Sequence, residues 1–183
     1  EGLKQVGTQV MLTDGIAKAF NAGRDQVAQS GAARPVMVAE AEGRKASPAL
    51  FETTATEFLK NPKLHHEVFG PLGLVVRAGT AEEIEAIARA LEGQLTVTLH
   101  LDEGDVAAAQ ALRPVLERKA GRLLVNGFPT GVEVVDSMVH GGPYPASTNF
   151  GATSVGTLSI RRFLRPICYQ NMPAALLPED ALG

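Results

Sequence analysis

The chain has 183 residues, of which 45% are hydrophobic and 20% are charged. It is long enough to bury one sizeable core and too apolar to be disordered. Seventeen basic and 20 acidic residues give a formal net charge of −3, which argues against nucleic acid as the main partner. The apolar runs are short and broken by charges, so we expect no membrane span, and the single cysteine excludes an internal disulfide.

The N-terminal residues contain neither an initiator methionine nor the charged and apolar pattern of a signal peptide. The first methionine is Met11. We therefore expect a processed or trimmed chain, or a piece of a longer protein, and a cytoplasmic location.

The first third of the sequence predicts one helix followed by short strands. Residues 1–30 have a helical pattern, with Asp14 as the N-cap and Ser30 at the end. Residues that favour strands then cluster in two places, and residues that favour turns separate them. The strands are expected at residues 36–39 and 49–54, and the turns at residues 40–47 and 61–62.

The middle of the sequence alternates between strand and helix patterns. Residues 72–77 form a continuous apolar run, which is typical of a strand covered on both faces. Helical spacing over residues 84–91 predicts a helix that Thr80 and Glu83 begin as a capping box. Further elements are expected as a strand at 95–101, a helix from Asp105 that Pro114 breaks, and a strand at 123–125. This order predicts an α/β fold with a mainly parallel sheet flanked by helices.

Several kinds of chemistry find no support in the sequence. A nucleophile elbow of the G-x-S-x-G kind is absent, and residues 151–157 lack the lysine of a phosphate-binding loop. The four histidines do not have the spacing of metal ligands, so we expect no metal site. Cys168 has only Arg165 nearby to lower its pKa, so we interpret it as a half-buried structural cysteine rather than a nucleophile.

One short string carries more specific chemistry. Glu67, Val68, Phe69, Gly70 and Pro71 stand directly before the apolar run of the expected strand. A carboxylate there can accept hydrogen bonds from two neighbouring hydroxyls, such as a ribose diol, and an aromatic ring two residues later offers a platform for a heterocycle. The alternative is a surface glutamate beside a core phenylalanine in an ordinary turn, and the string taken alone favours that alternative.

The string does not occur alone, because four segments resemble, in order, the C-terminal half of the aldehyde dehydrogenase superfamily. These segments are residues 67–71, 80–93 and 121–127 and the loop that begins at His140. The loop at 141–149 and the run at 161–171 are most similar to the branch that oxidises 2-oxoglutarate semialdehyde (2,5-dioxopentanoate). The resemblance covers essentially all of the chain.

The resemblance implies a small-molecule aldehyde substrate, an oxo-acid semialdehyde, and NADP or NAD as the cofactor. In the family, a cysteine thiolate attacks the aldehyde, hydride passes to the nicotinamide, and a glutamate activates the water that hydrolyses the thioester. By resemblance, Glu67 holds the nicotinamide ribose hydroxyls and Phe69 lies against the nicotinamide end. The residues expected to wall the aldehyde tunnel are Phe128, Pro129, Thr130, Gly131 and Val132, with residues 144–148 at its mouth.

The nucleophilic cysteine and the general-base glutamate of the family have no counterpart among these residues. We therefore expect them upstream, no catalytic residue in this chain, and no turnover by the chain alone. Residues 1–164 are interpreted as a partial catalytic domain, and residues 165–183 as a tail that can serve as an oligomerisation strand in a homo-oligomer.

Two questions stay open from the sequence. The alternative to an enzyme is a non-catalytic α/β binding or assembly module on the same scaffold, and the coding sequence ahead of Glu1 would discriminate between them. The arginine that would bind the carboxylate of an oxo acid is not assigned among Arg122, Arg161 and Arg165.

Overall fold

Parallel strand pairing forms the frame of the computed structural model, which describes residues 2–132 and 134–179. The pairs are β4 (Ala49–Thr54) with β5 (Leu72–Arg77), and β6 (Gln94–Leu99) with β7 (Ala120–Val125). β2 (Arg34–Met37) adds an antiparallel edge to β4, and β1 (Gln9–Val10) pairs with β3 (Lys45–Ala46). The α/β class and the mainly parallel pairing are confirmed.

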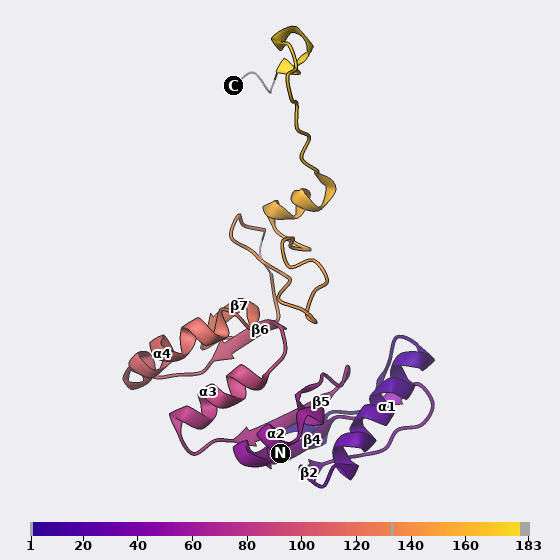
Figure 1. The fold of residues 1–183 in the computed structure, drawn as a ribbon. Coiled ribbons are helices and arrows are strands. Elements are labelled where there is room, and N and C mark those ends of the chain that lie inside the picture. Colours follow the sequence, from indigo (N-terminus) through magenta and orange to yellow (C-terminus); the bar gives the residue numbers. More distant parts are fainter. Residues whose placement is uncertain (1, 133, 180–183) are drawn as a thin grey trace.

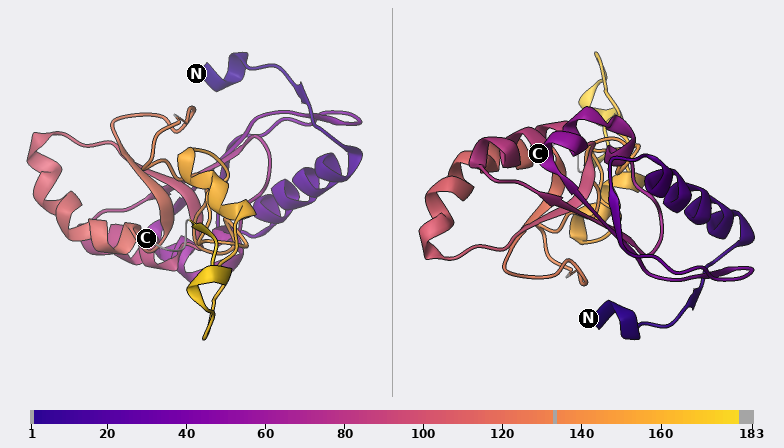
Figure 2. Two further views of the ribbon diagram at one scale, coloured as in Figure 1. Left: turned by 90° about the horizontal axis from the view of Figure 1, so that it is seen from above. Right: turned by 90° about the horizontal axis from the view of Figure 1, so that it is seen from below.

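Helices connect and cover these strands. They are α1 (Asp14–Gln29), α2 (Ala55–Lys60), α3 (Ala81–Ala90) and α4 (Val106–Leu116). Short 3-10 helices cover Gly2–Gln5, Pro62–His65, Glu103–Asp105, Thr157–Phe163 and Ala174–Leu176. α3 leads from β5 to β6, α4 leads from β6 to β7, and α3 contacts both α2 and α4 (Figures 1 and 2). Among the described residues, no helix combines the length and the apolar character needed to cross a membrane.

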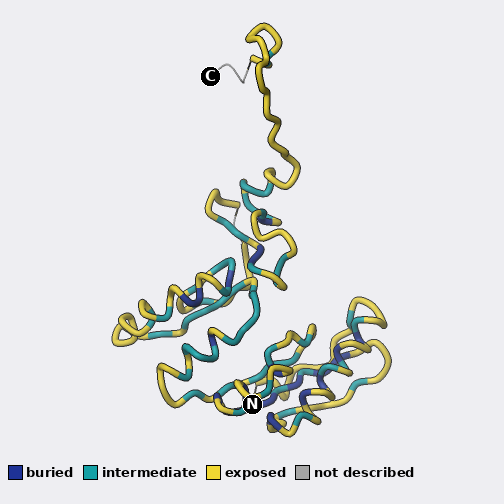
Figure 3. The backbone as a smooth tube through the Cα atoms, in the orientation of Figure 1, coloured by how far each residue is buried: buried dark blue, intermediate teal, exposed yellow. Residues whose placement is uncertain are grey.

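The main core surrounds Phe51 of β4, whose exposed fraction is 0%. Val27 of α1, Phe58 of α2 and Leu64 belong to the same buried cluster, which links the first helix to the β4–β5 pair. Burying a phenylalanine side chain stabilises a fold by roughly 1.5–3 kcal/mol. A second, smaller cluster joins α3, α4 and β6, and Figure 3 shows that the buried residues are concentrated in the part of the chain that carries these elements.

The parallel strands lie in two sheets rather than one. Within the described residues, β5 does not pair with β6, although α3 connects them directly. The sequence predicted residues 72–77 as a strand covered on both faces; the strand bounds are confirmed, but Val75 is largely exposed. The reason is that an apolar run specifies a strand, whereas its coverage depends on segments elsewhere in the chain.

The helical prediction for residues 1–30 is correct only from Asp14 onward. Thr13, not Asp14, is the N-cap of α1, because its Oγ1 accepts the Ile16 N–H at 3.2 Å. Leu3 and Leu12 are exposed, so a helix over the first residues would have no core against which to bury its apolar face. The short helix α2 was not predicted from the sequence.

The end of α4 and the start of α3 refine two further predictions. α4 continues through Pro114 to Leu116, because Val115 and Leu116 are buried in the second cluster and hold the last turn. At α3, Thr80 Oγ1 accepts the Glu83 N–H at 3.2 Å, as predicted. Glu83, however, accepts the N–H of Gly79 at 2.6 Å rather than that of Thr80, so the capping box is shifted by one residue.

Beyond the 3-10 helix of residues 157–163, the chain extends away from the sheets (Figure 1). Most of its apolar side chains are exposed there, among them Leu164 with an exposed fraction of 66%. The division into residues 1–164 and 165–183 stays a prediction, and residues 1, 133 and 180–183 of these two segments lie outside the described residues.

Glu52 of β4 should make the stability of the fold depend on pH. Its carboxylate pairs with Arg77 of β5 and Arg34 of β2, and the Arg77 hydrogen bond is the main cause that lowers the pKa of Glu52 below its ordinary value of 4.5. A lowered pKa means that the stabilisation is complete above the ordinary value and is lost as the pH falls through the lowered one. Glu52→Gln should therefore lower the melting temperature at pH 7, and the difference from the unmodified protein should shrink as the pH falls below about 4.5.

Thermal unfolding followed by circular dichroism between pH 7 and pH 3 measures this effect. Glu85→Gln is the matched control, because Glu85 pairs with a single arginine, Arg89, on the exposed face of α3. A Glu52→Gln difference that stays constant or grows on acidification would contradict the assignment.

Candidate functional site

Residues 66–71 lead into β5 and are held by a backbone hydrogen bond to β4 and by a side-chain contact from α1. The Ala49 N–H donates to the carbonyl of Pro71 at 2.8 Å, which sets the start of β5 against β4. Gly70 has a φ of +149°, a conformation that side chains rarely adopt, and Phe20 of α1 occupies the space that a Cβ would need. The segment that carries Glu67 therefore has a defined place relative to the β4–β5 pair and to α1.

Glu67 and Phe69 point outward from this segment. Phe69 has an exposed fraction of 68% and Glu67 is exposed, whereas Val68 between them is half-buried. Within residues 2–132 and 134–179, the Glu67 side chain forms no hydrogen bond or ion pair. Its carboxylate is therefore free to accept hydrogen bonds from a ligand, beside an open aromatic ring.

The two residues line a hollow of about 480 Å³ together with the start of β6 and one loop. β6 contributes Gln94 and Thr96, and the loop contributes Pro145 and Ala146. The sequence predicted that residues 144–148 shape the mouth of the aldehyde tunnel, and the structure brings Pro145 and Ala146 to the same hollow as Glu67. A second hollow of about 220 Å³ lies on the α1 side and is lined by Glu67, Phe69 and Gly23, among others.

An ion pair joins this segment to the turn before β6. His66 Nδ1 lies 3.2 Å from Glu92 Oε1, and Glu92 itself lines the larger hollow. The two side chains are 64% and 40% exposed, and the contact is an ion pair only when the His66 ring carries a second proton. Sequence reasoning missed this contact because nothing in the local pattern of either residue indicates the other.

The loop at 141–146 is docked closely on the starts of β6 and β7. The Gly93 N–H donates to the carbonyl of Tyr144 at 3.3 Å, and the backbone of residues 143 and 144 fills the space that a side chain at Gly93 would need. Gly121 faces Gly141, and Gly142 faces Gln94 in the same way. These glycines allow backbone to approach backbone, which holds Pro145 and Ala146 at the hollow.

The residues predicted to wall the aldehyde tunnel lie elsewhere. Phe128 follows β7, and its ring centroid is 5.7 Å from that of His100, which follows β6. The segment at 128–132 does not line the hollow of Glu67 and Phe69, so the described residues do not bring the two predicted groups together. Its role as a tunnel wall stays a prediction.

The side chain of Arg122, in β7, holds the segment at 128–132 by binding two of its backbone carbonyls. Its Nη1 donates to the carbonyl of Gly131 at 2.8 Å, and its Nη2 donates to the carbonyl of Pro129 at 3.2 Å. The Nε of Arg122 is buried and has no partner within the described residues. Because its terminal nitrogens already bind carbonyls, Arg122 is a positioning residue rather than a free arginine for a substrate carboxylate.

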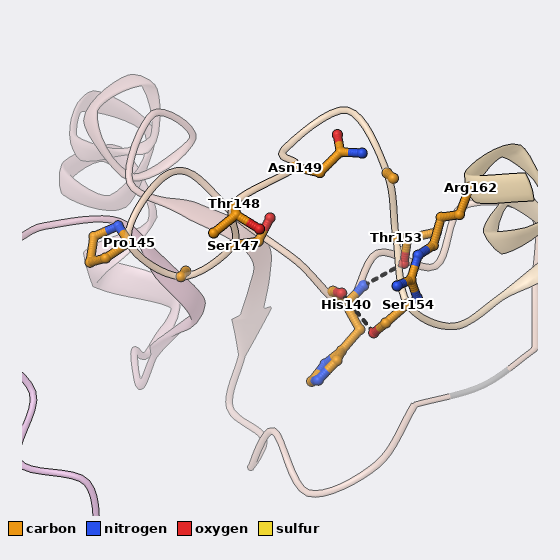
Figure 4. A pocket seen from close by; sticks show the side chains of 10 residues that line it. His140, Pro145, Ser147, Thr148, Asn149, Thr153, Ser154 and Arg162 are labelled. Atoms are coloured by element: carbon orange, nitrogen blue, oxygen red, sulfur yellow. Dashed lines mark hydrogen bonds between the residues drawn. The ribbon is translucent and has the colours of Figure 1, made fainter. Parts of the chain in front are cut away.

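An open hollow of about 360 Å³ is lined by the loop and by Arg162 (Figure 4). Arg162 comes from the 3-10 helix at 157–163 and points toward Thr153 and Ser154. Thr153 accepts the His140 N–H at 2.8 Å, and Ser154 donates to the His140 carbonyl at 3.0 Å, so hydroxyl groups hold the wall together. Sequence reasoning considered three other arginines and missed this one, because helical or extended spacing does not show which exposed arginine lies beside a hollow.

The hollow of about 480 Å³ that Glu67 and Phe69 line has groups that fit the nicotinamide and ribose part of a dinucleotide. A carboxylate without a partner can accept two hydroxyl hydrogen bonds, and an open phenyl ring can lie against a flat heterocycle. The arrangement supplies binding groups. Cys168 was predicted to be half-buried, and this was wrong, because the tail that carries it extends away from the sheets and leaves it exposed. In the described part of the chain, no three His, Cys, Asp or Glu side chains gather where they could share a metal ion.

The sequence is similar to two curated bacterial proteins. It is 54% identical over 172 residues to alpha-ketoglutaric semialdehyde dehydrogenase 2 of Azospirillum brasilense, and 45% identical over 174 residues to alpha-ketoglutaric semialdehyde dehydrogenase of Acinetobacter baylyi. Each match covers 93% of this chain but 33% of the relative, so the chain spans about one third of the length of these curated relatives. No family model matches the sequence.

The fold is similar to that of solved aldehyde dehydrogenases. A salicylaldehyde dehydrogenase from Pseudomonas putida G7, complexed with salicylaldehyde, superposes with a TM-score of 0.65 over 88% of this chain and 32% of its own, at 18% identity. A betaine aldehyde dehydrogenase from Staphylococcus aureus in complex with NAD⁺ gives a TM-score of 0.64 over 84% and 30% of the two chains, at 17% identity. At these identities the likeness establishes the fold alone.

Removing the Arg122 guanidinium should loosen the segment at 128–132. Arg122→Met keeps the stem of the side chain but leaves the carbonyls of Pro129 and Gly131 without their donor, so amide exchange in this segment should become several-fold faster. Hydrogen–deuterium exchange followed by mass spectrometry measures it. Arg118→Met is the control, because Arg118 also donates to one carbonyl, that of Pro114, but far from this segment. Unchanged exchange at 128–132 would refute the positioning role.

Proposed function

We propose that this chain forms part of an NAD- or NADP-dependent enzyme of the aldehyde dehydrogenase superfamily that oxidises 2-oxoglutarate semialdehyde to the corresponding carboxylate. Support for the substrate comes from the names of the two relatives, since alpha-ketoglutarate is another name for 2-oxoglutarate. The match leaves about two thirds of each relative uncovered, so the activity of the whole enzyme is proposed here.

The contribution of this chain is to hold and orient the cofactor at its reactive end. Glu67 accepts hydrogen bonds from the two ribose hydroxyls, and the ring of Phe69 lies against the nicotinamide. The observation that carries this assignment is the pairing of an unengaged carboxylate with an open phenyl ring at one hollow of about 480 Å³. When bound, the cofactor supplies the acceptor for the hydride that leaves the aldehyde carbon.

The remaining groups of the reaction come from sequence that this chain does not contain. Oxidation of an aldehyde to a carboxylate needs a nucleophile on one side of the carbonyl carbon and the hydride acceptor on the other, both held in fixed orientation. We propose an upstream cysteine as the nucleophile and an upstream glutamate as the base for water. In this arrangement residues 128–132, held by Arg122, wall the approach of the aldehyde.

The tail supports a further part of this proposal, a homo-oligomer. Residues 165–179 extend from the fold, and their apolar side chains, among them Ile167 and Tyr169, are exposed. Pairing with a second copy would bury this surface. Deleting residues from 165 onward should therefore reduce the oligomer to smaller species in size-exclusion chromatography with light scattering, and an unchanged mass would count against the assignment.

The Glu67 assignment is tested by Glu67→Gln in the complete enzyme. Glutamine keeps the size but loses the charge that makes ribose hydroxyl hydrogen bonds strong, so the KM for the cofactor should rise, or hydride transfer should slow, by about tenfold. Steady-state kinetics with 2-oxoglutarate semialdehyde measures both values. Glu85→Gln, on the outer face of α3, is the control and should leave them unchanged. A change of less than twofold in both values would refute the role of Glu67.

A further inference from the structure

We infer that Gly23 of α1 is a positioning residue for the cofactor-binding pair Glu67 and Phe69. The inference rests on the function proposed for that pair and extends it to a helix that the sequence resemblance did not connect with the site. Gly23 lines the smaller hollow beside Glu67 and Phe69. Gly23 has no chemical group that could bind the cofactor, and its role comes from its contact with the Val68 side chain.

The first observation is a close approach between α1 and Val68. A Cβ added at Gly23 would lie 2.8 Å from Cγ1 and 3.1 Å from Cγ2 of Val68, well inside the 3.4–4 Å of ordinary contact. Glycine is among the least favourable residues for a helix interior, and Gly23 lies in the middle of a helix of 16 residues. The absence of a side chain at this position therefore has a packing role.

The second observation is the alternation along residues 67–69. Val68 is half-buried and packs against the main core, whereas the residues on either side of it are exposed. The inward side chain is thus the anchor of the segment, and the two outward side chains are the proposed binding groups. A displacement of Val68 moves both of them together.

One turn earlier in α1, Phe20 makes the converse contact, in which the helix supplies the side chain and the segment supplies the glycine. Its side chain, with an exposed fraction of 1%, fills the space beside Gly70, where a Cβ would lie 3.0 Å from Phe20 Cε2. Gly23 packs against Val68, and Phe20 packs against Gly70, so the two helix residues form one packing surface on α1. This surface sets the distance between residues 67–70 and the helix.

The test is Gly23→Ala in the complete enzyme. The new methyl group would push Val68 outward by several tenths of an ångström, while the better helix propensity of alanine offsets the lost fit, so the melting temperature should change little. Because small misplacement of a binding group has large effects, the Kd for NAD⁺ or NADP⁺, measured by titration calorimetry, should rise by about tenfold. Amide exchange at residues 66–70 should also become faster without cofactor.

Gly15→Ala is the matched control. It makes the same substitution in the same helix, but the nearest atom to its new methyl group would be Thr13 Oγ1 at 3.8 Å. It should leave the cofactor Kd and the exchange at residues 66–70 unchanged. Equal effects of the two substitutions would overturn the inference.

The double variant Gly23→Ala with Val68→Ala tests the contact itself. Removing the two Val68 methyl groups makes room for the new one, so adding Gly23→Ala to Val68→Ala should change the cofactor Kd by less than about twofold. If Gly23→Ala alone fails to fold, recovery of a folded, cofactor-binding protein by the double variant supports the same contact. Val68→Ala alone is the reference, because Val68 also anchors the segment, and a tenfold rise in Kd on adding Gly23→Ala to it would overturn the inference.

Glu67→Gln, measured by the same calorimetry, separates this inference from the proposed function. If Glu67→Gln leaves the cofactor Kd unchanged, the assignment of Glu67 fails. If Glu67→Gln weakens binding and Gly23→Ala does not, the assignment stands and the positioning role of Gly23 fails.

Discussion

The parallel register between β4 and β5 is the constraint on which the site depends. Six consecutive pairs, from Ala49 opposite Leu72 to Thr54 opposite Arg77, fix the two strands against each other. A slip of one residue would shift the approach to β5 by about 3.3 Å and turn Phe51 out of the core. Since Phe51 is fully buried, the core enforces the register, and the register decides where Glu67 and Phe69 stand.

Two glutamates near the β4–β5 pair, Glu52 and Glu67, differ in whether their carboxylates are paired with arginines. At the carboxyl end of β5, Arg77 reaches Glu52 beside Arg34, and all three groups are engaged in stabilising the sheet. Before the amino end of the same strand, Glu67 has no such partner within the described residues. A carboxylate that neutralises arginines is committed to the fold, whereas one left open in a hollow is available to a ligand. This difference distinguishes the structural glutamate from the candidate functional one.

The sequence predicted the elements whose signals are local. The bounds of the strand at 72–77, the Thr80 cap and the class of fold follow from patterns within a few residues, and all are confirmed. The separation of β5 from β6 and the engagement of Arg122 with the carbonyls of Pro129 and Gly131 depend on segments distant in the chain, and no local pattern encodes them. The candidate residues Glu67 and Phe69 came from a resemblance, and the structure adds the surroundings that the resemblance lacked.

Glycines show why those surroundings cannot be derived from sequence. Gly2 and Gly104 have open space where a side chain would be, whereas the same space at Gly93 and Gly121 is filled by the backbone of the loop that reaches the hollow. All four are the same letter in the sequence, but only the last two allow one segment to lie against another. The loop carries Pro145 and Ala146 to the proposed cofactor site through these contacts, so the shape of that site depends on side chains that are absent as much as on those that are present.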